Sequence, residues 1–189
     1  MRAIPTTIAD VLVLEPTVVE DARGYFFESF NLREFSAALA QTPAGAFGNV
    51  LQFVQDNHSR STGNVVRGLH YQINRPQGKL VRVIEGTVFD VAVDLRASSA
   101  TFGHWVGTTL SSTNRRQKWI PPGFAHGFAV CSDEAQVLYK TTDYFAPDHQ
   151  RCIAWNDPAL NIDWPLQGEP VLSARDRCGT LLAEADVYL

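Results

Sequence analysis

Residues 79–95, KLVRVIEGTVFDVAVDL, contain two β-type runs on either side of Glu85-Gly86. Valine and isoleucine favour strands, and glycine adopts the positive φ of a tight turn at no steric cost. The turn therefore predicts a β-hairpin made of the two runs. This stretch indicates an antiparallel sheet as the basis of the fold.

The second run carries a polar side chain that the strand pattern does not explain. Alternation places Asp90 on the same face as Val88 and Ala92, whereas Phe89 and Val91 lie on the other face. A carboxylate among small apolar residues requires a partner. Asp90 is therefore either a rim residue or structural ion pair, or part of a functional site, and both interpretations stay open.

Runs of the same type recur along the chain, separated by Gly, Pro, Asn and Asp. We expect strands at Val11–Leu14, Tyr25–Phe30, Val50–Gln55, Val65–Tyr71, Lys79–Ile84, Thr87–Leu95, Trp105–Leu110, Phe128–Cys131 and Gln136–Phe145. The connections leave no room for the helical crossovers of a parallel sheet. The pattern predicts an all-β antiparallel sandwich or barrel.

One segment between the expected strands has helical spacing. Asn31 can cap a helix, and Glu34 follows it by three residues, as in a capping box. The apolar stripe of this helix consists of Leu32, Phe35 and Leu39. We expect it to pack outside the sheets. From Asp157 onward we expect loops with one or two short helices, one of them near Leu181–Ala185.

The composition indicates one globular domain, residues 1–189. Of the 189 residues 45% are hydrophobic, which is enough for one core and too many for a disordered chain. Sixteen Lys and Arg against twenty Asp and Glu give a formal charge of −4, which argues against nucleic-acid and anionic-membrane binding. No apolar stretch approaches the roughly 18 residues of a membrane span. We expect a cytoplasmic protein that meets any anionic ligand with local arginines.

The three cysteines are Cys131, Cys152 and Cys178, an odd number at wide spacing. This spacing fits neither a disulfide framework nor a thiolate metal site. We expect buried thiols or residues with no part in the chemistry.

Two histidines and one tyrosine stand out by their sequence context. His70 follows Gly68, which permits a bulge or a close approach of two strands. His126 follows the rigid apolar turn at 120–125, and alternation points Tyr139 into the barrel with its hydroxyl. Each residue taken alone is more typical of a core side chain with satisfied hydrogen bonds than of an active site.

Basic residues lie on neighbouring runs of this acidic chain. Arg67 and Lys79 form a cluster that suits a phosphate or an enolate. Arg82 is nearby in sequence, and for it we favour a solvated strand face.

Nine segments in a fixed order then carry a resemblance to a known family. They are DARGYFFE (21–28), QDNHS (55–59), RGLHYQ (67–72), QGKLVRV (77–83), DVAVDLR (90–96), IPPGFAHGF (120–128), LYKTT (138–142), WNDP (155–158) and LSARD (172–176). In these segments the chain closely resembles the dTDP-4-dehydrorhamnose 3,5-epimerases.

This resemblance implies both a fold and a reaction. The fold would be a cupin-type jelly roll with a few short peripheral helices, in a homodimer with strand exchange or close sheet contact. The reaction would be inversion at C3 and C5 of a dTDP-4-keto-6-deoxyglucose substrate on the route to dTDP-L-rhamnose, a precursor of cell-envelope polysaccharide. No cofactor and no metal are implied.

The resemblance also implies roles for individual residues. His70 matches the general base, Asp176 its carboxylate partner, Tyr139 the acid on the opposite face, and Lys79 the cation near the C4 oxygen. Contacts with nucleotide, diphosphate or sugar are implied for Arg23, Glu28, Gln55, Asp56, Asn57, Arg67, His126 and Arg175. To these we add Asp90 and Gln150 as expected substrate-binding residues.

The chain departs from the family pattern at three positions. Gln150 stands where Glu is usual, Phe145 where a second aromatic hydroxyl is frequent, and Arg175 where Lys is found. These departures leave open some nucleotide contacts and the choice between double and single epimerisation.

The chemistry of inversion explains why such residue types are needed. Removing a proton α to a ketone gives an enolate, which a nearby ammonium stabilises. One group must remove the proton from one face and another must return a proton to the opposite face. His70 and Tyr139 meet this demand if they face each other across the sugar.

Three other functions remain as alternatives. A metal-dependent cupin is suggested by the P-x-G-x-x-H pattern at 121–126, but no His-x-His followed by Glu surrounds His70. A related epimerase acting at C3 or C5 alone would share most of the same residues. A non-catalytic jelly roll that binds carbohydrate or nucleotide would need neither the His70 base nor Tyr139 opposite it.

Overall fold

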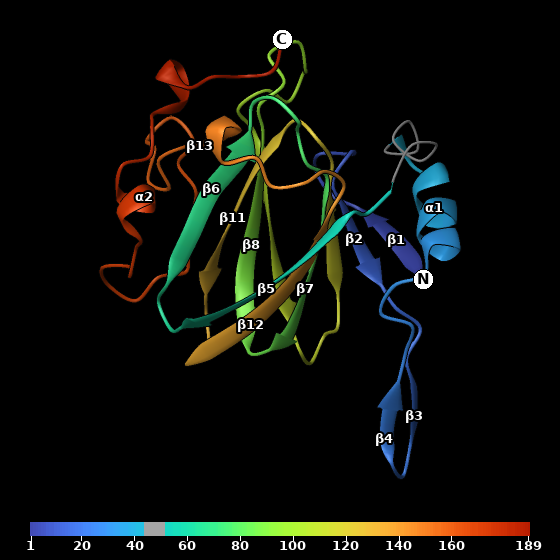
Figure 1. Cartoon of the computed structure of the whole chain (residues 1–189). Helices are drawn as coiled ribbons and strands as arrows, with labels where there is room; N and C mark the ends of the chain where they lie inside the picture. Colours follow the sequence, from blue (N-terminus) through green and yellow to red (C-terminus); the bar gives the residue numbers. More distant parts are fainter. Residues whose placement is uncertain (44–51) are drawn as a thin grey trace.

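The computed structural model describes residues 1–43 and 52–189. In this part of the chain two antiparallel sheets face each other, and a third sheet of two strands stands apart from them (Figure 1). One sheet has the order β1 (Arg2–Pro5), β2 (Leu12–Glu15), β10 (Gln117–Ile120), β7 (Lys79–Glu85), β12 (Glu134–Thr141), β5 (Gln55–Thr62). The other has the order β13 (Gln150–Cys152), β6 (Val66–Gln72), β11 (Phe124–Val130), β8 (Thr87–Asp94), β9 (Trp105–Ser111). The expected all-β jelly-roll architecture is confirmed.

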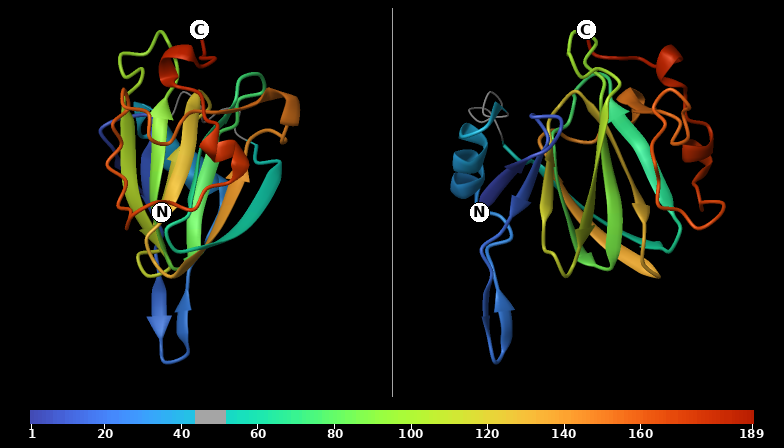
Figure 2. Two further views of the ribbon diagram at one scale, coloured as in Figure 1. Left: turned by 90° about the vertical axis from the view of Figure 1, so that its left-hand side faces the viewer. Right: turned by 180° about the vertical axis from the view of Figure 1, so that it is seen from behind.

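The main core lies between the two sheets. Val81 and Val137 point inward from the first sheet and meet Val88, Ala92 and Phe128 from the second. The outer face of each sheet has its own cover, as the two views of Figure 2 show. Helix α1 (Leu32–Ala40) covers the first sheet, and the C-terminal segment with α2 (Ala174–Arg177) lies over the second.

Helix α1 forms as its sequence predicts, except that Leu32 of the expected apolar stripe is 48% exposed. The Asn31 side chain accepts hydrogen bonds from the backbone amides of Arg33 and Glu34, which satisfies two of the free donors at the helix start. Phe35 and Leu39 are fully buried in the cluster outside the first sheet. The short helices expected in the tail are α2 and the 3₁₀ turn Leu182–Glu184.

The hairpin predicted at Glu85-Gly86 is wrong. Gly86 has φ +73° and the chain does reverse there, but β7 belongs to the first sheet and β8 to the second. β7 pairs with β10 and β12, whereas β8 pairs with β11 and β9. The turn therefore links the two layers of the sandwich. Turn chemistry fixes a local reversal, whereas the choice of pairing partner depends on distant strands.

Other strand boundaries differ in detail from the expectations. The strand expected at Val50–Gln55 begins in the structure at Gln55, and residues 50–51 lie outside the described part. The run expected to end at Phe145 ends at Thr141, and the run Tyr25–Phe30 is a strand only as far as Phe26. Four strands were not expected from the sequence, namely β1, β3 (Val19–Asp21), β10 and β13. The residues of β10, QKWI, are polar in part although all four are buried.

A two-stranded arm extends away from the barrel (Figure 1). It consists of β3 (Val19–Asp21) and β4 (Gly24–Phe26), joined by a turn. Val19, Tyr25 and Phe26 are 62%, 58% and 71% exposed, so the arm carries apolar surface that the chain itself does not bury.

The remaining expectations concern cysteines and membrane spans. Cys131 and Cys178 are exposed and Cys152 is half-buried, so for the two exposed residues only the alternative of thiols with no part in the chemistry remains, and all three thiols are free. None of the helices among residues 1–43 and 52–189 has the length and apolarity needed to cross a membrane.

Candidate active site

A cavity of about 150 Å³ lies between the sheets. Side chains of both sheets contribute to it, together with residues after β12. Its walls are formed by Ser59, Arg67, His70, Tyr71, Gln72, Gln77, Lys79, His126, Phe128, Tyr139, Phe145 and Gln150. His70, Lys79, Tyr139, Arg67, His126 and Gln150 were all expected site residues, and the fold brings these six into one cavity.

His70 forms the first of two histidine–carboxylate pairs. Its Nε2 lies 2.6 Å from Asp176 Oδ1, and the imidazole is 28% exposed while the carboxylate is 3% exposed. Ser173 donates to the other carboxylate oxygen at 2.6 Å. Burial alone would raise the pKa of Asp176, but the hydrogen bonds from His70 and Ser173 outweigh it and lower that pKa. Asp176 is therefore ionised and orients the ring, leaving Nδ1 free.

Gly68 explains how His70 reaches this position. Its φ is +132°, and a Cβ there would lie 2.4 Å from the Cα of Gly127 on the neighbouring strand. The ladder between β6 and β11 changes register at this point, between His126 and Phe128. The close approach predicted from the glycine is confirmed, and it sets His70 directly opposite His126.

Lys79 and Tyr139 approach the cavity from the first sheet. Lys79 is 8% exposed, and its Nζ donates to the backbone oxygen of His70 at 3.2 Å. Burial lowers the pKa of Lys79 to about 8, against the opposing influence of Asp90. Burial also raises the pKa of Tyr139, with Arg67 acting in the other direction, so the phenol keeps its proton at neutral pH.

His126 belongs to the second histidine–carboxylate pair. Its Nε2 lies 2.7 Å from Asp90 Oδ2, and Asp90 is fully buried. Lys118, also fully buried, places Nζ 3.2 Å from Asp90 Oδ1 and donates to the backbone oxygens of Asp90 and Val106 at 2.7 and 3.0 Å. Burial opposes the charge on Asp90, but His126 and Lys118 together lower its pKa. Burial lowers the pKa of His126, so this imidazole is neutral.

Further expected residues surround the cavity. Gln55 donates to Asn57 at 2.8 Å and accepts a hydrogen bond from the amide of Phe145, which lines the cavity. Arg175 donates to Gln150, so two of the three departures from the family pattern are hydrogen-bonded to each other.

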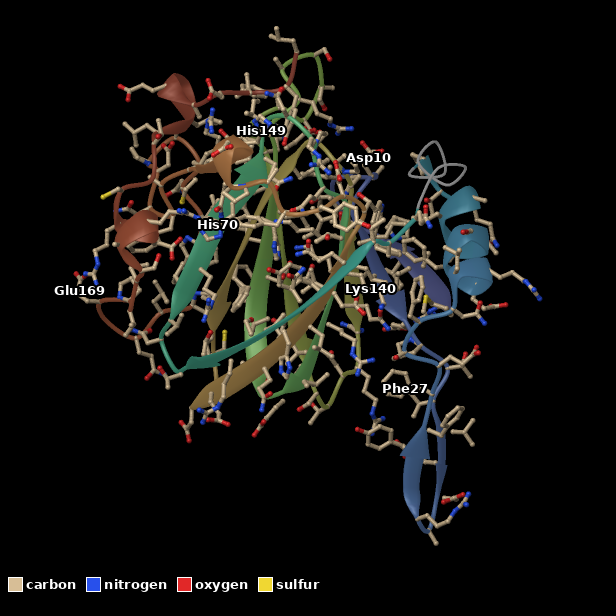
Figure 3. The ribbon with its side chains drawn as sticks, in the orientation of Figure 1. Asp10, Phe27, His70, Lys140, His149 and Glu169 are labelled. Atoms are coloured by element: carbon tan, nitrogen blue, oxygen red, sulfur yellow. The ribbon has the colours of Figure 1, made fainter. Side chains whose placement is uncertain are left out.

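Four expected substrate contacts do not line this cavity, and for two of them, Asp90 and Asp56, the assignment needs correction. Asp90 has no exposed surface, so it supports His126 from behind and does not touch a ligand. Asp56 points to the outer face of the first sheet, where its 70% exposed side chain pairs with Lys140. Arg23 is at the tip of the arm and Glu28 follows the arm. In Figure 3 the neighbouring Phe27 lies at the base of the arm, far from His70.

Sequence reasoning missed Ser59 as a site residue. Its Oγ is buried in the cavity wall without a hydrogen-bond partner among the described residues. Strand alternation could have found it, because Gln55 and Asn57 are expected site residues and Ser59 is the next position on the same face. Phe145 also lines the cavity, where it supplies an apolar wall in place of a hydroxyl.

The comparisons with known proteins agree on one family. The family model described as dTDP-4-dehydrorhamnose 3,5-epimerase matches residues 5–184. A Pseudomonas aeruginosa protein named dTDP-4-dehydrorhamnose 3,5-epimerase is 58% identical over 188 residues, which is 100% of this chain and 99% of that protein. A Shigella flexneri protein with the same name is 52% identical and matches over 100% of each chain.

A solved structure agrees with these sequence matches. The dTDP-6-deoxy-D-glucose-3,5-epimerase of Legionella pneumophila, in complex with dTDP-4-keto-L-rhamnose, superposes with a TM-score of 0.91 at 48% identity. The match covers 98% of this chain and 94% of that chain.

Proposed function

The chain belongs to the dTDP-4-dehydrorhamnose 3,5-epimerase family, and we propose that His70, Tyr139 and Lys79 carry out its epimerisation. The activity is that of an isomerase, which inverts C3 and C5 of dTDP-4-dehydro-6-deoxy-D-glucose on the route to dTDP-L-rhamnose. The observation that carries the residue assignment is that His70 and Tyr139 line one cavity from opposite sheets.

Two opposed groups are what inversion requires. His70 Nδ1 takes the proton from the carbon next to the ketone, and the electron pair of the C–H bond becomes the enolate. The Tyr139 hydroxyl then delivers a proton to the other face of the planar carbon. A single group on one face would return the proton where it came from. After turnover, His70 gives its proton to water and the Tyr139 phenolate takes one back.

Lys79 supplies the charge that the enolate needs. Its ammonium reaches across the cavity, as its hydrogen bond to the His70 backbone oxygen indicates. In a buried site a fixed cation stabilises negative charge that develops on the C4 oxygen far more than water does. Asp176 stabilises the imidazolium that forms on His70 and holds the ring in one orientation.

The size of the cavity indicates that the sugar lies inside it and the nucleotide outside it. A space of about 150 Å³ is below the roughly 300–1,000 Å³ of sites for drug-sized ligands, so the dTDP portion lies outside the cavity mouth. Arg67 lines the cavity with an exposed side chain that is suited to the diphosphate. Binding energy from the nucleotide then holds the small sugar in position for reaction.

We infer that the chain acts as a homodimer in which each arm completes the partner's site. Arg23 and Glu28, which the family resemblance assigns to the substrate, lie away from their own cavity. The apolar side chains of the arm are exposed, and burying them against a second copy would remove this surface from water. Both features support an arm that reaches over the partner's cavity mouth.

Deuterium exchange tests the acid–base assignment. Incubation of the dTDP-4-keto sugar with the protein in deuterated water should place label at both C3 and C5 of the inverted product. In the Tyr139→Phe variant His70 still removes and returns the proton on one face, so NMR should show label with retained configuration. The His70→Asn variant should give no label. Label at one carbon with the unaltered chain would indicate a monofunctional epimerase, and no label would contradict the function.

Subunit complementation tests whether the arm of one subunit completes the site of the other. His70→Ala lacks the base and Arg23→Ala lacks an arm contact, so each homodimer should be weakly active. Refolding a mixture gives heterodimers in which an Arg23→Ala subunit keeps His70 and receives a complete arm. Activity should then rise well above the sum of the two parents. A mixture no more active than that sum, or a monomer by light scattering, would contradict the proposal.

A further inference from the structure

Cys152 lies directly against the His70–Asp176 pair, and the mechanism above does not use it. Strand β13 pairs with β6 so that Cys152 is the cross-strand partner of His70. Its Sγ is 3.9 Å from Asp176 Oδ1, the oxygen that also binds His70. One ligand atom from each of the three residues lies within 4.8 Å of the other two. An imidazole, a thiol and a carboxylate thus converge on one point.

The thiol is held in its protonated form. Burial, with the Asp176 carboxylate second, raises the pKa of Cys152 to about 12. Thiolate is the reactive form of cysteine, so this residue is a poor nucleophile and a poor target for oxidation. A ligand that displaces the thiol proton and forms a bond to sulfur can still bind Cys152.

The three ligand atoms lie near enough to one another for a movement of about 1 Å to give the spacing of a tetrahedral zinc ion. Zinc binds sulfur at about 2.3 Å and nitrogen or oxygen at about 2.0–2.2 Å, which sets neighbouring ligand atoms roughly 3.5 Å apart. The sulfur–oxygen distance of 3.9 Å is near this value, and the nitrogen–oxygen distance of 2.6 Å must open by about 1 Å. Asp176 keeps its bond from Ser173 through the second oxygen while it does so.

We propose that His70, Cys152 and Asp176 form a binding site for a thiophilic divalent ion such as Zn²⁺, and that the bound ion switches the epimerase off. The donor set of one thiolate, one neutral imidazole and one carboxylate is of the kind zinc selects, and its two negative charges balance the ion. The inhibitory part of the inference rests on the proposed role of His70 as base.

The inhibition follows from where the protons go. The ion forms a bond to Cys152 Sγ, and the thiol proton leaves to solvent. A second bond forms to His70 Nε2, whose proton moves to Nδ1, the nitrogen that faces the substrate. An imidazole with metal on one nitrogen and a proton on the other cannot accept a proton from the sugar. Asp176, which now binds the ion, no longer supports an imidazolium.

Cobalt spectroscopy detects metal bound at the proposed site without any assay of activity. Co²⁺ added to the intact chain should produce a sulfur-to-cobalt charge-transfer band together with the strong visible bands of tetrahedral Co²⁺, and Zn²⁺ should abolish both. Cys152→Ser changes one atom in a half-buried side chain and should lose the charge-transfer band. Cys131→Ser removes an exposed thiol on another strand end and serves as the matched control that keeps it.

Enzyme kinetics test whether the bound ion inhibits the epimerase. Zn²⁺ should inhibit the unaltered chain and Cys131→Ser equally, and a chelator should restore both. Cys152→Ser should turn over at the normal rate without metal and need at least about tenfold more Zn²⁺ for the same inhibition. Equal zinc sensitivity in Cys152→Ser and the unaltered chain, or a charge-transfer band that survives the substitution, would overturn the site.

The two readouts also separate this site from the proposed function. A Cys152-dependent cobalt band in a chain with no epimerase activity would refute the function and keep the metal site. Full activity with no cobalt band would keep the function and refute the metal site.

Discussion

The two histidine–carboxylate pairs in the barrel contain the same groups but differ in their surroundings. His70 and His126 are cross-strand partners on β6 and β11, and each bonds a buried aspartate through Nε2. The His70 side chain is 28% exposed, whereas that of His126 is 8% exposed. Its greater exposure would allow His70 to exchange protons with a substrate and with water in the proposed mechanism, whereas His126 lines the same cavity but is nearly buried.

The charge around each aspartate differs as well. Asp176 has Ser173 as its second donor, a neutral group, so the carboxylate can stabilise a positive charge that appears on His70. Asp90 already faces the Lys118 ammonium, so its negative charge is balanced before His126 could gain a proton. This difference supports the proposed role of His70 as base, because Asp176 has no other cation to neutralise among the described residues, whereas Asp90 has Lys118.

The largest expected effect separates the two histidines. His70→Asn removes the base and should lower kcat by about 10⁴-fold, the upper end of the range for acid–base groups. His126→Asn removes a contact in the cavity wall and should change KM about tenfold with a smaller effect on kcat. Steady-state kinetics on both variants check this. Losses of equal size in kcat would mean that both histidines transfer protons.

Substitutions of the two aspartates should differ in the property that they change as well as in the size of the effect. Asp176→Asn should lower kcat about 10³-fold with little change in stability, because it loses the support of the imidazolium. Asp90→Asn should lower the free energy of unfolding by about 3–5 kcal/mol, because it leaves the Lys118 ammonium buried without a counter-charge. Denaturant unfolding measures this loss. Adding Lys118→Met to Asp90→Asn should recover much of it, and a purely additive double variant would contradict the pairing.

Much of this arrangement could be predicted from residue patterns, and the remainder depends on long-range geometry. Alternation put Asp90 on the same face as Val88 and Ala92, and Gly68 indicated the close strand approach; the structure buries that face and confirms the close approach. Which aspartate meets which histidine could not be derived from spacing, because Asp176 is 106 residues from His70. The family resemblance, not the pattern, supplied that partner.

The predictions that the structure contradicts can also be explained in physical terms. The turn at Gly86 is a local property and its φ was foreseen, but strand pairing is decided by contacts across the whole chain. Asp56 alternates to the outer face, so strand period alone should have excluded it from the cavity. For Arg23 the sequence motif carries no information about which copy of the chain it serves.

Lys79 extends the comparison to a buried cation for which we propose a catalytic role. Lys79→Met should lower kcat by about 10²-fold, because the enolate loses its fixed charge. The same change should raise the free energy of unfolding at pH 7, by at most about 3 kcal/mol, because it removes a buried ammonium whose pKa is lowered from 10.5 to about 8. The lost hydrogen bond to the His70 backbone reduces this gain. A variant that is both slower and less stable would show that Lys79 has a structural role.

The pH profile gives a milder test of the same lysine. The ammonium form is required, so kcat/KM should fall as pH rises through about 8, the pKa to which burial lowers Lys79. Lys79→Arg keeps its charge throughout and should move this decline to higher pH. The folded chain binds fewer protons than the unfolded chain between pH 8 and 10.5, so this group adds stability as pH rises through that window. An unchanged alkaline limb in Lys79→Arg would assign the limb to another group.

The smallest expected effect concerns Ser59, whose hydroxyl has no partner among the described residues, whereas each aspartate lies within hydrogen-bond distance of its histidine. An unpaired buried hydroxyl costs free energy, and a sugar hydroxyl in the cavity would satisfy it. Ser59→Ala should therefore raise KM about threefold and leave the unfolding free energy unchanged or slightly higher, since the variant removes a group satisfied only in the complex. Ser61→Ala, which removes the acceptor of the Arg67 Nε–H, is the control that should lower stability instead. Ser59 lies on the same face of β5 as Asn57. An unchanged KM in Ser59→Ala would therefore place the sugar on the His70 side of the cavity, away from that strand.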